Sequence, residues 1–363
     1  MFMNKKYYSL GLMSGTSMDG IDASIICSNG IDDFNVIENY YYKYDDRFID
    51  KLTDLKNKIN KPEDLKSYSN NLQIFNRELT LLHAEFVNKI LKKNENKIDL
   101  VGFHGQTIYH NPSEKISKQL GDGELLSQLI KKKVVYNFRD NDLRNNGDGA
   151  PLTPIYHFAI SKKLSKKNIL FLNIGGIANE TLIGEEGLIS AKDLGPGNCL
   201  IDLWIRLNTN KKYDFDGLVA RSGKVNKIIL DQSLDIYFNN KISKKRSYDA
   251  KDFDISSFRG LNLEDGAATI IEYTIEILSS KLSSKNIISC GGGRKNYYLI
   301  ERLEKKIKKK ILQIDSFKMD GDFTESQAFA FLAIRSLLNL PISFPSTTGC
   351  IKELTGGIIS KNI

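Results

Sequence analysis

The stretch GLMSGTSMDGID, residues 11–22, decides the fold class of this 363-residue chain. Apolar residues from Tyr7 to Met13 predict a buried strand at its start, and Ile21 to Cys27 predicts a second strand at its end. Glycines in the turn let the backbone approach a ligand closely, and its amides and hydroxyls suit phosphate oxygens. The same residues also suit a tight hairpin without a ligand. The stretch therefore predicts a strand–turn–strand unit and leaves two uses open for its turn.

The same pattern returns in the second half of the chain. A strand is predicted at Ile169–Asn173, a glycine turn at Gly175-Gly176 and another strand at Ala178–Ile183. A third glycine turn, Gly291–Gly293, follows a strand predicted at Asn286–Cys290 and precedes a helix, whose first amides favour an anion. Alternating helices and strands are typical of an α/β architecture. Three glycine turns at strand ends fit a nucleotide held in a cleft between two domains.

Length and composition indicate a globular protein of two domains, which we place at residues 1–150 and 151–363, with the C-terminal helix able to pack back on the first. The 52 basic and 44 acidic residues give a net charge of +8. The basic residues are mostly lysines and are spread along the whole chain. Proteins that read nucleic acids gather arginine and aromatic residues on one surface. We therefore expect no nucleic-acid partner.

The sequence also predicts a cytoplasmic protein without a membrane partner. No stretch approaches 18 consecutive apolar residues, and the apolar run near the start is too short for a signal peptide. The four cysteines (Cys27, Cys199, Cys290 and Cys350) lie far apart and form no metal-binding or redox pair motif. Such usage is typical of a reducing compartment.

Two carboxylates are candidates for chemistry. Asp193 lies in KDLGPGN, residues 192–198, between a predicted strand and a predicted helix. It could accept a proton from an attacking hydroxyl or water, or it could be an ordinary acidic residue at a helix N-terminus. Glu325 opens the last long helix, where it could complete a capping box or orient a substrate. The residues alone leave both alternatives open.

Three further side chains are candidates for substrate binding. His104 and Gln106 follow a predicted strand and suit hydrogen bonds to a sugar, although a structural histidine is an equal alternative. Arg139 could bind a carboxylate through two parallel hydrogen bonds or pair with the acids that follow it. Asp19 or Asp22 could face a divalent cation on phosphate oxygens, but the histidines have no zinc-site spacing, so the metal ligands stay unassigned.

Taken in order along the chain, these segments resemble the anhydro-N-acetylmuramic acid kinase family, within the superfamily of actin-like proteins, sugar kinases and Hsp70 ATPases. The resemblance covers essentially the whole chain. The matching segments are GLMSGTSMDGID from Gly11, GFHGQTIYH from Gly102, GDGAPLTPIYH from Gly147, LNIGGIAN from Leu172, DLGPGNCLID from Asp193, CGGGRKN from Cys290, GDFTESQAFAFLA from Gly321, and the tail PISFPSTTGC from Pro341.

This resemblance implies two actin-like (ribonuclease H-like) ATPase domains with a cleft between them. It implies a cytoplasmic phosphotransferase of peptidoglycan recycling that uses ATP and Mg²⁺ and acts on an alcohol group. The family adds water at the anomeric carbon of 1,6-anhydro-N-acetylmuramic acid and phosphorylates the freed 6-oxygen. The products are N-acetylmuramic acid 6-phosphate and ADP. The resemblance also suggests a homodimer.

The resemblance assigns roles to single residues. Asp193 would be the base that activates water, and Glu325 would help to hold the sugar. His104, Gln106 and Arg139 would contact the substrate, with Arg139 facing the lactyl carboxylate. The implied nucleotide-binding residues are Gly15, Thr16, Ser17, Met18, Asp19, Gly20, Ile21 and Asp22 in the first phosphate loop, Gly175 and Gly176 in the second, and Gly291, Gly292 and Gly293 along the adenosine.

The chain departs from the family pattern at three places. Leu194 stands where the family usually has threonine, and the segment 137–142 carries fewer arginines than usual. Ser326 replaces a customary alanine, which we expect to be tolerated. The altered segment keeps open a kinase of another amino sugar. A nucleotide-binding regulatory protein without catalysis is a second alternative, and sugar-dependent release of ADP would separate it from both kinases.

Overall fold

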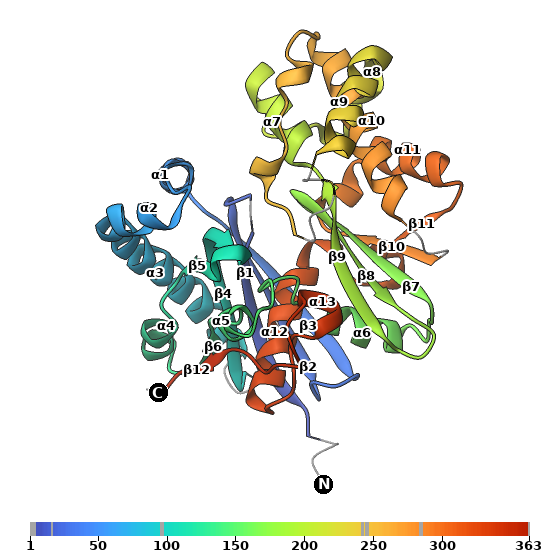
Figure 1. Cartoon of the computed structure of the whole chain (residues 1–363). Coiled ribbons are helices and arrows are strands. Elements are labelled where there is room, and N and C mark those ends of the chain that lie inside the picture. The colour runs from blue at the N-terminus through green and yellow to red at the C-terminus, as the bar shows by residue number, and fades with distance from the viewer. Residues whose placement is uncertain are drawn as a thin grey trace. The chain divides into compact units, whose positions relative to one another are not determined.

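The computed structural model describes residues 5–15, 17–94, 98–240, 243, 247–282 and 286–361. The chain divides into two compact units, here called unit 1 (Met1–Ser165 with Phe323–Ile363) and unit 2 (Lys166–Asp322). Each unit contains one sheet and its helices (Figure 1). This partition differs from the domains predicted from the sequence, whose bounds stay a prediction.

The sheet of unit 1 has seven strands. They are β1 (Tyr7–Ser14), β2 (Gly20–Ser28), β3 (Phe34–Lys43), β4 (Leu100–Asn111), β5 (Ile116–Leu120), β6 (Lys133–Tyr136) and β12 (Ile358–Ile359). Along the sheet the order is β12-β6-β4-β1-β2-β3, and β5 pairs with β4 off this path. The first three strands are antiparallel neighbours, whereas β4 runs parallel to β1 and β6 parallel to β4. The two strands predicted around residues 11–22 are confirmed as β1 and β2.

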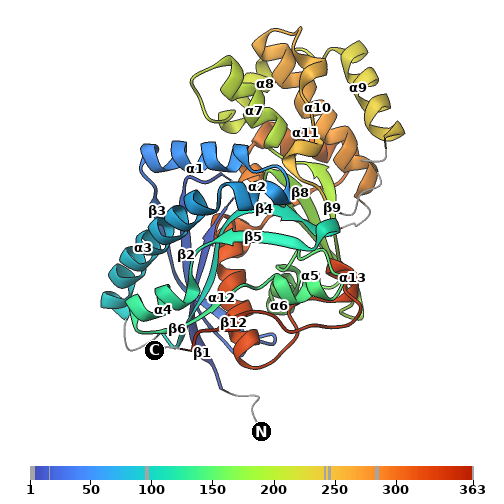
Figure 2. The ribbon, with the colours of Figure 1, turned by 60° about the vertical axis from the view of Figure 1, so that its left-hand side comes forward.

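Helices cover both faces of this sheet. They are α1 (Asp46–Lys58), α2 (Pro62–Ser67), α3 (Ser69–Asn94), α4 (Gly123–Ile130), α5 (Asp140–Arg144), α6 (Pro154–Lys163), α12 (Thr324–Leu337) and α13 (Pro345–Thr348). Leu10 and Leu12 of β1 belong to the same apolar core as α3, whereas a side chain at Gly11 would collide with α12. Since neighbouring residues of a strand face opposite sides, α3 and α12 lie on opposite faces (Figure 2).

The close approach of α12 explains two glycines of the sheet. A Cβ atom at Gly11 would lie 1.9 Å from the carbonyl oxygen of Ser326, and one at Gly102 would lie 2.2 Å from that of Phe329. Only glycine leaves room for the helix backbone at these two positions. The helical stretch that periodicity predicts over residues 62–91 is divided between α2 and α3. Near the break the Ser67 hydroxyl bonds the Glu63 carbonyl, a contact that competes with regular helix.

Unit 2 repeats the same sheet order. Its strands are β7 (Ile169–Ile174), β8 (Ile177–Ile183), β9 (Ile189–Pro196), β10 (Asn286–Cys290) and β11 (Ile311–Gln313), in the order β11-β10-β7-β8-β9. Strands β7, β8 and β9 are antiparallel neighbours, and β10 and β11 continue in parallel from β7. Both units therefore have the 3-2-1-4-5 order of a ribonuclease H-like sheet, which confirms the predicted fold class.

The helices of unit 2 pack mainly around its longest member. They are α7 (Cys199–Asn208), α8 (Leu218–Ser222), α9 (Lys227–Asn239), α10 (Leu263–Lys281) and α11 (Tyr297–Ile307). Helix α10 contacts each of the other four as well as β9. Trp204, the single tryptophan of the chain, is 2% exposed, and its indole N–H donates to the Leu263 carbonyl at 2.9 Å. Within the described ranges, no helix combines the length and apolar character needed to cross a bilayer.

Candidate active site

The β1–β2 turn of unit 1 is held by a side chain from the neighbouring strand β4. Gln106, 1% exposed, donates from Nε2 to the Gly15 carbonyl at 3.0 Å. The Ser14 hydroxyl donates to Gln106 Oε1 at 2.8 Å. Met18 has a positive φ of 55°, and its N–H donates to the Gly15 carbonyl at 3.2 Å. Gln106 thus holds the predicted first phosphate loop through its side-chain amide. Thr16, which is also predicted to belong to this loop, lies outside the described residues.

Two carboxylates stand at this turn. Asp19 and Asp22 are both partly exposed, and the Ser17 hydroxyl donates to Asp19, while Gly20 and Ile21 are buried at the start of β2. Within the part of the chain that the structure describes, no group of three or more His, Cys, Asp or Glu side chains could hold a metal alone. Mg²⁺ in phosphate-transferring enzymes is usually held by one or two carboxylates and the phosphates themselves. The oxygen donors of Asp19 and Asp22 fit that kind of site.

His104 and Arg139 contact each other directly in unit 1. The Arg139 guanidinium donates to His104 Nε2 from Nη2 at 2.8 Å and from Nε at 3.2 Å. His104 Nδ1 lies 2.8 Å from the Gly105 carbonyl. A carbonyl only accepts and a guanidinium only donates, so these partners assign the neutral tautomer with the proton on Nδ1. Burial first, and then the charge of Arg139, lower the pKa of His104 well below its usual value.

Arg139 is itself anchored at the start of α5. Its Nη1 donates to the Gly149 carbonyl at 2.7 Å. Asp142, 1% exposed, accepts from the Gly149 N–H at 2.7 Å and from the Thr348 hydroxyl at 2.6 Å. Burial lowers the pKa of Arg139 to about 10, against the opposing charges of Glu325 and Asp142. The structure therefore brings His104, Arg139 and Glu325 into one electrostatic neighbourhood; the substrate contacts of all three stay a prediction.

Glu325 lies in the first turn of α12, and the residue after it explains how one departure from the family pattern is accommodated. Ser326 is fully buried, and its hydroxyl lies 2.7 Å from the Ser24 hydroxyl of β2. It also donates to the Phe323 carbonyl at 3.0 Å. The extra oxygen has partners, so this polar side chain is satisfied inside the core.

The β7–β8 turn of unit 2 is held by backbone groups instead. The Gly197 N–H donates to the Gly176 carbonyl at 2.9 Å, and the Asn198 N–H donates to the Gly175 carbonyl at 2.8 Å. A Cβ atom at Gly197 would lie 2.3 Å from the Gly175 carbonyl oxygen. The loop that follows β9 is therefore fastened to the predicted second phosphate loop by backbone hydrogen bonds.

The third glycine turn lies beside the second. Strands β7 and β10 are parallel, with Asn173 opposite Cys290, so their carboxyl ends share one edge of the sheet. Gly291 has a φ of +78°, and a Cβ atom there would lie 2.3 Å from Asn173 Oδ1. A Cβ atom at Gly293 would lie 2.3 Å from the Ile174 side chain, whereas Gly292 faces open space. The structure thus brings the glycines predicted to bind nucleotide in unit 2 to one place.

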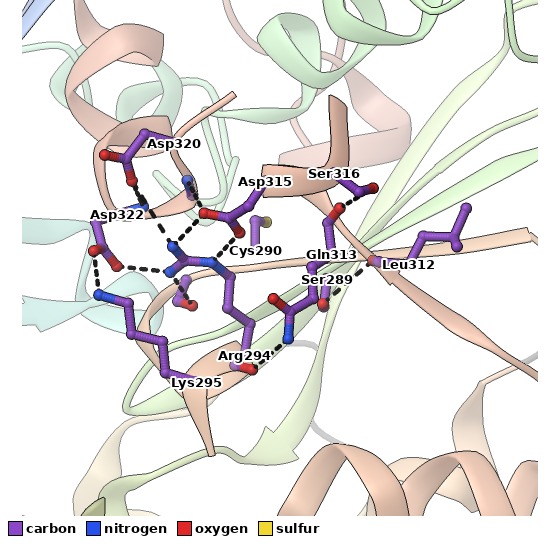
Figure 3. Close-up of polar contacts among 12 residues, drawn as sticks. Ser289, Cys290, Arg294, Lys295, Leu312, Gln313, Asp315, Ser316, Asp320 and Asp322 are labelled. Carbon is purple, nitrogen blue, oxygen red and sulfur yellow. Dashed lines mark hydrogen bonds and ion pairs between the residues drawn. The ribbon is translucent and has the colours of Figure 1, made fainter. Parts of the chain in front are cut away.

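The side chain of Arg294 ties this third turn to two neighbouring aspartates (Figure 3). Its side chain is 2% exposed and donates to both oxygens of Asp315, at 2.6 and 2.8 Å. It also donates to Asp322 at 2.6 Å and to the Gly291 carbonyl at 3.1 Å. These carboxylates raise the pKa of Arg294 against the effect of burial, so the guanidinium stays charged. Lys295 makes a further ion pair with Asp322.

Asp193 lies inside β9, at a β-bulge. Ala178 of β8 pairs with Gly195, but the next residue, Asn179, pairs with Asp193, so Leu194 is the extra residue. Bulges re-aim side chains and are common next to active sites. The Tyr248 N–H donates to Asp193 Oδ2 at 2.8 Å, and the Asp193 side chain is partly exposed. The sequence placed Asp193 after a strand; the bulge could not be foreseen, because it depends on the exact register of β9 against the preceding strand β8.

The predicted residues fall into two groups. Gln106, the first turn, His104, Arg139 and Glu325 belong to unit 1, whereas Asp193 and the other two glycine turns belong to unit 2. Sequence reasoning missed Lys281, whose ammonium group donates to the Leu194 carbonyl at 2.6 Å. A lysine in the last turn of a helix is ordinary, because it suits the helix dipole.

Comparison with known proteins gives one consistent result. The family model described as anhydro-N-acetylmuramic acid kinase matches residues 6–362. A relative of that name from Pelagibacter ubique (strain HTCC1062) is 49% identical over 374 residues, which cover 99% of this chain and 100% of the relative. One from Zymomonas mobilis is 39% identical, covering 97% and 99%. Among solved structures, an activator of 2-hydroxyisocaproyl-CoA dehydratase from Clostridium difficile with bound ADPNP is 12% identical, covering 92% and 96%, with a TM-score of 0.45.

The family match and these two relatives extend over nearly the entire sequence, including every segment that carries a predicted site residue. The chain therefore belongs to the anhydro-N-acetylmuramic acid kinase family.

Proposed function

We propose that this protein transfers the γ-phosphoryl group of ATP to O6 of 1,6-anhydro-N-acetylmuramic acid while water opens the anhydro ring. The protein is a kinase, a phosphotransferase with an alcohol acceptor that serves peptidoglycan recycling, because it belongs to a family of that activity. The observation that carries the proposal is the match of residues 6–362 to that family.

Asp193 is the proposed general base. Its carboxylate takes a proton from water as the water oxygen bonds to the anomeric carbon, on the face opposite the departing oxygen. The bond from that carbon to O6 breaks, and O6 receives the phosphoryl group, so N-acetylmuramic acid 6-phosphate and ADP leave. Two features support this role: the bulge at Leu194 re-aims the strand, and the Tyr248 amide holds one carboxylate oxygen while the side chain stays partly exposed.

The glycine turns are the proposed phosphate and adenosine contacts. The β1–β2 turn with Asp19 and Asp22, and the turn Gly175-Gly176, would hold the phosphates, and Gly291–Gly293 would follow the adenosine. Mg²⁺ bound with ATP would neutralise charge on the phosphoryl oxygens, and Asp19 and Asp22 are its proposed protein ligands. Phosphoryl transfer needs mainly such positioning and charge, which loop amides and carboxylates supply.

Unit 1 supplies the proposed sugar contacts. Glu325, His104, Gln106 and Arg139 would contact the sugar, with Arg139 facing the lactyl carboxylate. Arg139 stays charged at neutral pH, which suits a carboxylate ligand. Both nitrogens of His104 have protein partners, so a direct sugar contact through either one requires that partner to be replaced. We also propose that the protein works in the cytoplasm as a homodimer, without a nucleic-acid or membrane partner.

The decisive experiment measures ADP release with Mg²⁺-ATP and four additions: 1,6-anhydro-N-acetylmuramic acid, N-acetylmuramic acid, N-acetylglucosamine and no sugar. We expect strong stimulation by the anhydro sugar alone. Stimulation by another sugar would support a kinase with a different substrate, and the altered segment around Arg139 would then be the part to test for specificity. Bound ATP without stimulation by any sugar would contradict the proposal in favour of a regulatory protein.

A further inference from the structure

Lys281 ends α10 next to the bulge that carries Asp193. Its ammonium nitrogen donates to the Leu194 carbonyl at 2.6 Å, to the Tyr237 hydroxyl at 2.9 Å and to the Tyr248 hydroxyl at 2.9 Å. An ammonium group has three protons, and here each has an acceptor. It also lies over both tyrosine rings, 5.5 and 4.9 Å from their centroids. The side chain is therefore fixed in one orientation.

The carbonyl that Lys281 binds belongs to the extra residue of the bulge. Leu194 has no register partner on β8 within the described ladder, and it is fully buried. A buried backbone carbonyl without a partner is unfavourable, so a bulge at such a place needs a donor from outside the ladder. Lys281 is that donor. Losing it would leave the bulge, and with it the direction of the preceding Asp193 side chain, without its support.

Lys281 reaches Asp193 by a second route. Its ammonium group binds the hydroxyl of Tyr248, and the backbone N–H of the same tyrosine donates to Asp193 Oδ2 at 2.8 Å. The Tyr237 hydroxyl, 3.1 Å from that of Tyr248, completes the cluster. One cation thus supports both the backbone after Asp193 and the donor that orients its carboxylate.

We propose that Lys281 is the positioning residue of Asp193, acting through the Leu194 carbonyl and through Tyr248. The expected effect of Lys281 on kcat rests on the proposed function. Its expected effect on the order of the bulge does not. The leucine at position 194 offers only its backbone to this contact. The side chain of Leu194 has no polar group, so we infer that in this chain Lys281 is the residue that orients Asp193.

The charges around Lys281 make its support depend on pH. Burial first, and then the charge of Lys192, lower the pKa of Lys281 to about 8, while Asp193 acts in the opposite sense. The titratable groups facing it are Lys192 and Asp193 of β9, Tyr237 of α9 and Tyr248. Above pH 8 the neutral amine loses its charge, and its contacts with the Leu194 carbonyl and the two tyrosine rings weaken, because hydrogen bonds from a charged donor and cation–π contacts are the stronger ones.

The structural test uses hydrogen–deuterium exchange and requires no catalysis. We expect Lys281→Met to speed exchange of the Tyr248 amide and of the amides of residues 195 and 197–199, while the β7 amides keep their protection. Lys281→Arg keeps a cation, so the same amides should lose less of their protection from exchange than in Lys281→Met. The matched control is Lys305→Met: Lys305 likewise lies in the last turn of a helix, α11, but pairs with Glu301 at 2.7 Å. Unchanged protection of Tyr248 in Lys281→Met, or equal loss in the control, would overturn the proposal.

The catalytic test compares kcat, KM and their pH dependence in the same variants. We expect kcat of Lys281→Met to fall by roughly 10²-fold, as for a misplaced catalytic group, with KM for ATP unchanged. The wild-type kcat should decline above pH 8, and this decline should be absent in Lys281→Met. A KM effect alone, or an unaltered pH profile, would refute the catalytic role. If the wild type lacks sugar-dependent ADP release, the proposed function fails, and hydrogen–deuterium exchange alone decides the positioning role.

Discussion

The β1–β2 turn of unit 1 and the β7–β8 turn of unit 2 occupy the same place in two sheets of the same order, but different groups hold them. In unit 1 a buried glutamine side chain, Gln106, binds the turn at Ser14 and Gly15. In unit 2 the amides of Gly197 and Asn198 bind the carbonyls of Gly176 and Gly175. A turn held by one side chain can be released by one substitution, whereas a turn held by backbone is sensitive to added volume.

The two units also differ in which buried groups have pKa values shifted toward neutral pH or away from it. All four histidines lie in unit 1, and burial lowers the pKa of each. Residues 166–322 contain none. Unit 2 instead has buried or largely buried acids, among them Asp202, whose pKa burial raises to about 7. Burial favours the neutral form of both kinds of group, so the stability of the two units depends on pH in opposite directions.

The largest effect is expected at Asp193, the proposed base in unit 2, and it is an effect on kcat. Asp193→Asn removes the proposed base and should lower kcat by roughly 10²–10⁴-fold, because asparagine cannot take the proton of water. Nucleotide affinity should stay nearly unchanged, since backbone groups hold the glycine turns. Steady-state kinetics and calorimetric titration with ATP measure the two quantities. Asp231→Asn, at an exposed position of α9, is the control; wild-type turnover in Asp193→Asn would refute the assignment.

The pH prediction separates the two units directly. His83 and His157 have folded-state pKa values of about 4 and about 3, so their stabilising contribution is present above pH 6.5 and is lost as the pH falls. Each should cost unit 1 about 2 kcal/mol between pH 7.5 and 5. Asp202 has a raised pKa, so its contribution is present at low pH and is lost as the pH rises through 7. Unit 2 should therefore gain stability over the same acidification.

Trp204 makes this measurable, because the single tryptophan reports on unit 2. At pH 5 we expect thermal unfolding followed by far-UV circular dichroism to begin below the transition followed by Trp204 fluorescence. Asp202→Asn should raise the Trp204 transition at pH 7.5 and have little effect at pH 5. Coincident transitions at both pH values would contradict independent responses of the two units.

A smaller effect is expected from releasing the side-chain-held turn. Gln106→Ala leaves the Gly15 carbonyl and the Ser14 hydroxyl without this partner, at a cost of about 2 kcal/mol. Urea unfolding measures the loss, and KM for ATP should rise because the first loop is released. Gln119→Ala is the control on β5, since its amide binds hydroxyl groups away from the turn. An unaltered unfolding midpoint for Gln106→Ala would show that the β1–β2 turn is stable without the Gln106 side chain.

The smallest effect compares added volume at the two turns. Gly197→Ala should destabilise by about 1 kcal/mol, because its Cβ atom would lie 2.3 Å from the Gly175 carbonyl oxygen and the loop must shift. Gly15→Ala should destabilise less, since the nearest atom to its Cβ, Ser17 Oγ, is 3.9 Å away. Melting temperatures of the two variants test this order. The reverse order would mean that the backbone contacts in unit 2 are not what holds its turn.

Local patterns were sufficient to predict much of this fold. The strand predicted at 286–290 agrees with β10 at both ends, because the glycine turn marks where it stops. The glycine turns were likewise visible. The bulge at Leu194 was not, since it depends on the exact register of β8 against β9, and the contact of Lys281 was not, since it joins residues 87 apart in sequence. Strand β5 was missed because its residues do not alternate clearly between buried and exposed. Helix α1 was missed although Asp45 caps it and Phe48, Leu52 and Leu55 have helical spacing.

Unit 1 is assembled from two separate stretches of chain, and this has a consequence for synthesis on the ribosome. Its first 165 residues emerge about 160 residues before the stretch that begins at Phe323. At roughly 5–20 residues per second this interval is about 8–30 s. During that time β1, β2 and β4 lack α12, the helix that covers one face of their sheet. Unit 2, which is continuous, can complete itself first, so the nascent protein needs residues 323–363 before the part of unit 1 made earlier is protected from aggregation.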